Sequence, residues 1–257
     1  EAAWKILAET VYAEPPPSTA NNIKHALCAR PALEQPKQSA AKPHSNPAAL
    51  VDAWKLLIEA APQATSSDGY RFDLCDVGRE VLADLSTRYN QQIIAAYRAR
   101  DAAKLHELSG KMLGLIRDLD KLAGTRREWL LGVWLDDARS WGATPAEKDL
   151  CERNARELLT TWTRYDNIPD YANRQWNGLL GDYYYHRWAM WLKALNDSLA
   201  HGSALNETAT RKQIENWELS WTRQTNGGFA TKPHGNAIAI SRELFKKYAA
   251  DASQTGM

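Results

Sequence analysis

Apolar residues recur every three or four positions along almost the whole chain after Pro62. The clearest case lies between residues 102 and 123, where they are Leu105, Leu108, Met112, Leu115, Leu119 and Leu122. This is the spacing of one face of an α-helix, whereas a half-buried strand alternates every second residue. Alternating segments rich in Val, Ile and Thr are essentially missing, so the chain has little with which to build a sheet. The pattern predicts an all-α fold.

The periodicity and the residues at its ends divide the chain into seven to nine helices. We expect them over residues 2–12, 48–61, 70–99, 102–123, 128–141, 145–162, 176–195, 206–221 and 238–249. The heptad-like pattern in 102–123 lasts under three heptads, which favours a helix in a bundle over a free coiled coil. No repeat near 34 or 40 residues is present, which disfavours a solenoid. We therefore predict a helical bundle forming a single domain over residues 1–257.

Proline is concentrated near the N-terminus. Eight of the eleven prolines lie at or before Pro62, and residues 15–47 hold seven of them among Ser, Ala, Asn and Lys. Such a composition is typical of extended loops. We expect residues 13–47 to form a long loop within the domain.

Charge and cysteine usage exclude several classes of partner. Lys and Arg number 32 against 31 Asp and Glu, so the basic excess of a nucleic-acid surface is missing. No apolar run approaches the length of a membrane span. The three cysteines are widely separated, and none of the six histidines pairs with another at metal-ligand spacing. We expect isolated thiols, no metal and no cofactor.

Motifs of known catalytic sites are also missing: no Gly-rich loop follows a strand, and no serine lies in a GxSxG motif. Two carboxylate pairs lie on expected helices, Asp73 with Asp76 and Asp136 with Asp137. Because arginines lie close by, including Arg139, we interpret both pairs as solvated or arginine-paired. Arg71, Asp73, Asp76 and Arg79 are thus expected to be structural or interface groups.

Aromatic residues gather in one part of the chain. Residues 162–191 hold nine of the 24 Phe, Trp and Tyr residues. Within them, the segment 162–173 combines Trp and Tyr with Asp and Asn, which offers flat apolar faces beside hydrogen-bonding groups, as sugar sites require. Composition alone leaves two interpretations, a structural aromatic loop and a ligand-facing loop, with the structural one favoured.

The chain begins Glu1-Ala2-Ala3-Trp4, without an initiator Met, a basic region or an apolar signal region. This start has the composition of a helix interior. We expect the chain to be a piece of a longer polypeptide.

Five segments resemble the C-terminal helical domain of the α-N-acetylglucosaminidases, a family of glycoside hydrolases. They are AAWKILAETVY (2–12), VDAWKLLIEAAP (51–62), YRFDLCDVGREVLADLSTRY (70–89), REWLLGVWLDDAR (127–139) and DYANRQWNGLLGDYYYHRWAMWL (170–192). The resemblance keeps their order and similar spacings and extends to about Tyr248. It is weak over 13–47 and 222–237.

The resemblance implies that an upstream (β/α)8 barrel carries two glutamates, which remove terminal α-linked N-acetylglucosamine with retention. A retaining site needs two carboxyls about 5 Å apart, so no catalytic residue is expected here and the isolated chain should be inactive. The helical domain would pack on the barrel and help to close the pocket. The matching substrate-binding positions are Trp162, Tyr171, Asn173 and Trp176.

One alternative stays open, a stand-alone helical carbohydrate-binding or interaction module without hydrolase activity. The expected compartment is the periplasm or the exterior if the source is bacterial, and the lysosome if it is eukaryotic.

Overall fold

The computed structural model describes residues 1–13, 25–34, 46–162, 170, 172–225 and 228–254. Over these ranges the chain forms ten α-helices and no strand, which confirms the all-α prediction. The helices are α1 (Ala2–Glu9), α2 (Pro47–Glu59), α3 (Ala61–Ala64), α4 (Asp68–Arg98), α5 (Ala102–Ala123), α6 (Leu131–Ser140), α7 (Pro145–Leu159), α8 (Tyr185–Ala200), α9 (Glu207–Thr222) and α10 (Ala237–Ala252). Three shorter elements are the 3-10 turns η1 (Ala26–Cys28) and η2 (Arg127–Trp129) and the π-helical turn η3 (Leu179–Tyr184).

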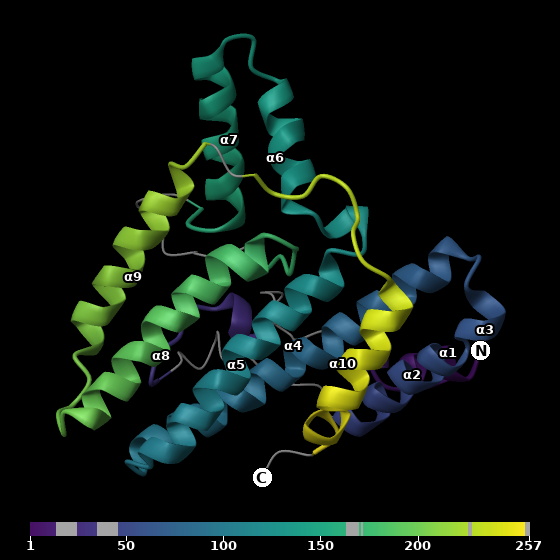
Figure 1. The fold of residues 1–257 in the computed structure, drawn as a ribbon, viewed down its shortest axis with the longest axis horizontal. Coiled ribbons are helices and arrows are strands. Elements are labelled where there is room, and N and C mark those ends of the chain that lie inside the picture. The colour runs from purple at the N-terminus through teal and green to yellow at the C-terminus, as the bar shows by residue number, and fades with distance from the viewer. Residues whose placement is uncertain (14–24, 35–45, 163–169, 171, 226–227, 255–257) are drawn as a thin grey trace.

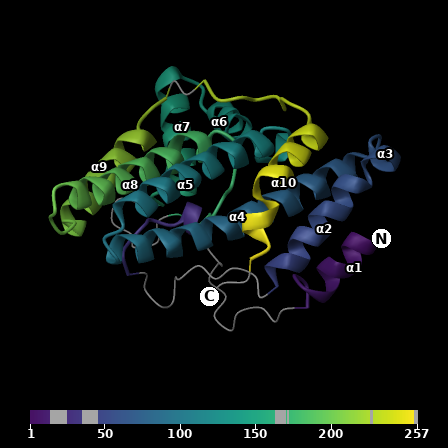
Figure 2. The same cartoon turned by 60° about the horizontal axis from the view of Figure 1, so that its bottom comes forward.

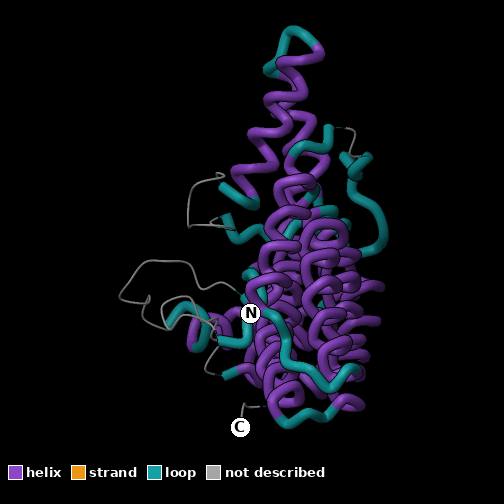
Figure 3. The backbone as a smooth tube through the Cα atoms, turned by 90° about the vertical axis from the view of Figure 1, so that its left-hand side faces the viewer, coloured by secondary structure: helices purple, strands orange, loops and turns teal. Residues whose placement is uncertain are grey.

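The long helices α4 and α5 form the centre of the molecule (Figure 1). Helices α8 and α9 extend the bundle on the α5 side, while α2, α1 and α10 pack on the α4 side. Helices α6 and α7 form a hairpin that projects from one end, as the side view shows (Figure 3). Of the residues between α7 and α8, Trp176 contacts α6 and Asp170 contacts α8, so these two lie where the hairpin meets the bundle.

Large aromatic side chains fill the core between these helices. Trp54, Trp188, Trp191 and Trp221 are all buried. Helix α2 approaches α4 closely because Gly78 has no side chain: a Cβ there would lie 2.8 Å from the indole nitrogen of Trp54. Burial of this kind, rather than helix propensity, supplies most of the stability of a bundle.

The Pro-rich region is less uniform than predicted. Residues 14–24 and 35–45 lie outside the described residues, but between them η1 is buried and packs against α4 and α8 (Figure 2). Its backbone is held by side chains: Leu27 N donates to Ser86 Oγ at 3.3 Å, and the Trp188 indole donates to Leu27 O at 3.0 Å. This part of the expected extended loop is therefore a buried turn, because its apolar residues and these tertiary hydrogen bonds compensate for ordering the chain.

Cys28, Cys75 and Cys151 are all free, the first two buried and the third half-buried. No helix in the described ranges is long and apolar enough to cross a bilayer.

Candidate functional site

The segment between α7 and η3 carries an unusual backbone. Four non-glycine residues of the described part have a left-handed φ, and three of them lie here: Trp162 at 60°, Asp170 at 58° and Asn173 at 47°. Such a conformation costs a residue about 1–3 kcal/mol and persists only where the surroundings impose it. Because strained residues cluster at functional sites, the backbone itself marks the described residues between α7 and η3 (160–162, 170 and 172–178), here called the α7–η3 segment, as a candidate.

The end of this segment is fixed by Asp120 of α5. Its carboxylate accepts hydrogen bonds from Gly178 N at 2.7 Å, Gly181 N at 2.8 Å and Asn177 Nδ2 at 2.8 Å. Burial raises the pKa of Asp120, and these donors oppose that rise by favouring the ionised form. Asp120 thereby holds the start of η3, a π-helical turn of the kind often found at functional sites.

A cluster of four buried or half-buried charges anchors the middle of the segment. Arg187 of α8 donates two hydrogen bonds to the Asp170 carboxylate, both at 2.9 Å, and one to Glu218 of α9 at 2.6 Å. Arg30 donates to the second oxygen of Glu218 at 2.5 Å. Burial lowers the pKa of Arg187, but the negative charges of Asp170 and Glu218 outweigh it and hold the pKa above its usual value. The segment is thus tied to three other parts of the chain.

The predicted site residues lie on or beside these anchors. Trp162 and Asn173 are half-buried and occupy two of the strained positions. The backbone N–H of Trp162 donates to Glu157 O at 2.7 Å, and the backbone N–H of Asn173 donates to Asp170 O at 3.0 Å. Tyr171 lies outside the described residues.

Trp176 is placed differently from the prediction. It does not begin the next helix, which starts at Leu179, and Trp162 does not end α7, which stops at Leu159. The half-buried Trp176 ring packs edge-on against Trp134 of α6, with ring centroids 5.9 Å apart. Part of its role is therefore to join the segment to the α6–α7 hairpin.

Sequence reasoning missed Gln175, which is buried between two charged groups. Arg79 Nη1 donates to Gln175 Oε1 at 3.4 Å, and Gln175 Nε2 lies 3.1 Å from His25 Nδ1. Arg79 also pairs with Asp76 at 2.6 Å, as their spacing on one helix predicted. Asp136 and Asp137 are exposed, in line with the solvated interpretation, whereas Asp73 is half-buried and its pKa is raised by burial and by Asp76. A glutamine in an aromatic segment gave no sequence signal for this contact.

Within the described residues, one group of side chains has the composition of a metal site: His25, Glu80 and Asp84. His25 Nε2 lies 3.0 Å from Glu80 and 3.3 Å from Asp84. Burial lowers the pKa of His25, but the two carboxylates outweigh it and raise the pKa to about 10. The four-residue spacing of Glu80 and Asp84 on α4 was visible in the sequence, but the distant histidine was not.

These two carboxylates are unsuited to glycoside hydrolysis. Their oxygens come within 4.8 Å of each other, close to the separation of a retaining pair. However, Asp84 is only 2% exposed and both groups face His25, so a sugar cannot enter between them.

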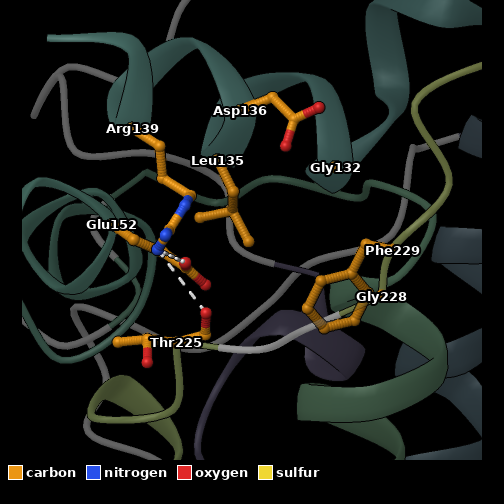
Figure 4. Close-up of a pocket in the computed structure, with 8 residues that line it drawn as sticks. All are labelled: Gly132, Leu135, Asp136, Arg139, Glu152, Thr225, Gly228 and Phe229. Atoms are coloured by element: carbon orange, nitrogen blue, oxygen red, sulfur yellow. Dashed lines mark hydrogen bonds and ion pairs between the residues drawn. The ribbon is translucent and has the colours of Figure 1, made fainter. Parts of the chain in front are cut away.

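A polar pocket of about 230 Å³ lies between α6, α7 and the segment before α10 (Figure 4). It is lined by Gly132, Leu135, Asp136, Arg139, Glu152, Thr225, Gly228 and Phe229. Arg139 crosses it to reach Glu152 at 2.8 Å and Thr225 O at 3.5 Å, and it also pairs with Asp149. Its charge is therefore already balanced, and the pocket is smaller than a typical ligand site.

Comparison with known proteins gives these features a context. The sequence-family model described as the α-N-acetylglucosaminidase C-terminal domain matches residues 1–247 of this chain. Human α-N-acetylglucosaminidase is 31% identical over 248 residues, which are 96% of this chain and 33% of the human protein.

Solved structures of a family 89 glycoside hydrolase from Clostridium perfringens are also similar. The complex with PUGNAc has a TM-score of 0.85 and 27% identity, covering 96% of this chain and 29% of that one. A double glutamate-to-glutamine variant, in complex with its substrate GlcNAc-α-1,4-galactose, has a TM-score of 0.85 and 26% identity, covering 95% and 29%. The chain therefore spans about a third or less of the length of these relatives. Because the family model matches nearly its whole length, this chain belongs to the family of α-N-acetylglucosaminidase C-terminal domains.

Proposed function

We propose that this chain is the C-terminal domain of an α-N-acetylglucosaminidase and that its α7–η3 segment forms part of the sugar pocket. Family membership carries the first part of the proposal, and the strained backbone of the segment supports the second. The chain, as one all-α domain, packs on an upstream (β/α)8 barrel. That barrel supplies the two glutamates of a retaining hydrolase.

The substrate is a glycan that ends in α-linked N-acetylglucosamine. Support comes from the bacterial relative, whose substrate is GlcNAc-α-1,4-galactose. An exported enzyme fits the resemblance, periplasmic or secreted in a bacterium and lysosomal in a eukaryote. A cleavable signal sequence in the coding region, and cell fractionation, test this compartment.

The described side chains suit such a substrate. The Trp162 indole offers a flat face on which the C–H face of a sugar ring can stack. The side-chain amide of Asn173 provides both a donor and an acceptor for the acetamido group or a hydroxyl. Tyr171 joins them on the strength of the resemblance alone. The Arg187 and Asp120 side chains hold Asp170 and Gly178 in place before the sugar arrives, which lowers the entropic cost of binding.

The test replaces Trp162 by Phe in the full-length enzyme, with Trp191→Phe as a matched control in the core of α8. Activity is measured on an aryl α-N-acetylglucosaminide, and the melting temperature of each variant is recorded. We expect Trp162→Phe to lower kcat/KM by about three- to tenfold with little change in Tm. Trp191, which is 1% exposed, should instead lose several degrees of Tm while activity per folded molecule is preserved.

Trp176→Phe should lower both quantities, because Trp176 also packs on Trp134. If Trp162→Phe unfolds early and keeps normal kcat/KM, Trp162 belongs to the core and the proposed pocket is wrong. Binding of the sugar by residues 1–257, with no barrel encoded upstream, would instead favour the stand-alone module.

A further inference from the structure

His25, Glu80 and Asp84 form a buried group outside the proposed pocket. His25 directly precedes η1, and the two carboxylates lie one turn apart on α4. Their side chains are 7%, 30% and 3% exposed, respectively. All three ligand atoms, the imidazole nitrogen and one oxygen of each carboxylate, lie within 4.8 Å of one another.

The imidazole is the informative member of this group. Its Nε2 atom is buried and does not meet regular hydrogen-bond geometry, yet it lies 3.0 Å from a Glu80 oxygen and 3.3 Å from an Asp84 oxygen. A ring nitrogen held this close to two carboxylate oxygens, away from water, requires either a proton or a bound cation between them. Here the atom faces two carboxylates, in the arrangement of a ligand nitrogen.

The separations also fit a bound cation. Zinc bonds to imidazole nitrogen and carboxylate oxygen are about 2.0–2.2 Å long, so neighbouring ligand atoms lie about 2.9–3.5 Å apart in octahedral or tetrahedral geometry. The distances from His25 Nε2 to the Glu80 and Asp84 oxygens fall within this range. The half-exposed Glu80 can adjust to complete the geometry.

We propose that His25, Glu80 and Asp84 bind a first-row divalent metal ion, with Zn²⁺ as the best match. Imidazole with carboxylates suits Zn²⁺, whereas Mg²⁺ and Ca²⁺ prefer oxygen ligands alone. Two carboxylates balance the charge of the ion. Glu80 also lines a cavity of about 130 Å³ between α1 and α4, which gives the ion a route from solvent and leaves room for a water ligand.

The second ring nitrogen connects this site to the α7–η3 segment. His25 Nδ1 lies 3.1 Å from the Gln175 amide. When Nε2 binds the metal, Nδ1 carries the ring proton and donates a hydrogen bond to Gln175, which must then turn its side-chain oxygen toward the ring. This requires the amide to turn over and release its 3.4 Å hydrogen bond from Arg79. The ion would then connect η1, α4 and the residue next to Trp176.

The test measures Zn²⁺ binding to the full-length protein after EDTA treatment, by equilibrium dialysis and elemental analysis. The variants are Glu80→Gln and Asp84→Asn, and the control is Asp76→Asn, which lies one turn before Glu80 and pairs with Arg79 instead. We expect the wild type and the control to bind one Zn²⁺ more than Asp84→Asn. Glu80→Gln should weaken binding at this site by about tenfold or more.

Thermal melts provide a second readout that does not depend on activity. Zn²⁺ should raise the Tm of the wild type and of Asp76→Asn, but not that of Asp84→Asn, since a ligand that binds only the folded state stabilises it. Glu80 is partly exposed, so Glu80→Gln decides the question if Asp84→Asn fails to fold. Equal Zn²⁺ content in the wild type and Glu80→Gln, with equal Tm shifts, would overturn the proposal. His25 would then be a protonated imidazole paired with the two carboxylates. Neither result depends on the proposed sugar pocket.

Discussion

Arg187 joins three separate parts of the chain through one guanidinium group. Besides Asp170 and Glu218, it donates to the carbonyl of Cys28 in η1 at 3.2 Å and to the Tyr183 hydroxyl at 2.8 Å. The side chain is completely buried. Removing one member of a buried ion pair costs about 3–5 kcal/mol, because the remaining charge is left unpaired.

Replacing Arg187 by Lys should therefore separate the effect of the positive charge from that of the hydrogen bonds made by the guanidinium group. Lys keeps the positive charge but cannot hold Asp170 with two hydrogen bonds while also reaching Glu218. We expect the full-length variant to melt several degrees lower and to lose kcat/KM, because the segment loses its anchor. The control is Arg153→Lys, in an exposed pair with Glu157, which should change neither quantity. Unchanged Tm and kcat/KM in Arg187→Lys would show that the anchor is dispensable.

Single contacts of this kind were the least predictable part of the site. The sequence marked the aromatic segment as a candidate, because Trp, Tyr, Asp and Asn are dense there. It did not predict the Arg187–Glu218 or His25–Glu80 contacts, which join residues far apart in the sequence. A charged residue that will be buried looks the same in a sequence as a solvated one, because only the tertiary fold decides its environment.

A change at Asn173 should lower activity without lowering stability, because this residue adopts a left-handed backbone conformation. Asn173→Gly accepts the left-handed φ without strain but removes the amide proposed to face the sugar. We expect the free energy of unfolding to change by less than about 1 kcal/mol. At the same time kcat/KM should fall about tenfold, the value of one lost hydrogen bond.

The matched control is Arg100→Gly, at the fourth left-handed position, which is exposed between α4 and α5. It should equal or exceed the wild type in stability and keep full activity. A loss of activity in both variants would show that left-handed backbone in general, rather than this segment, affects the enzyme.

Elements differ in how well their sequences predict them. Residues 102–123 were predicted as a helix and form α5, because the apolar spacing is regular and Asp101 caps the first turn through Lys104 N. The helix expected from 176 begins instead at Leu179. Its apolar stripe continues backward through Trp176, and periodicity cannot detect the positive φ of Gly178. The buried turn η1 was missed because contacts with α4 and α8 stabilise it.

Taken whole, the molecule places the strained segment at the junction of the α6–α7 hairpin with the bundle (Figure 1). The all-α class was predictable, since the helical period runs through most of the chain. The role of the domain was not predictable from periodicity, and it came from the resemblance of whole segments. Under the proposed function, the reacting carboxylates lie on the barrel and this domain contributes contacts to the pocket.

The most direct measurement of this division compares two proteins on an aryl α-N-acetylglucosaminide: residues 1–257 alone, and the same residues joined to the upstream barrel. Circular dichroism first establishes that both are helical and folded. We expect the joined protein to release the aryl group and the folded chain alone to release none, at any pH. Release of the aryl group by purified residues 1–257, free of other hydrolases, would contradict it.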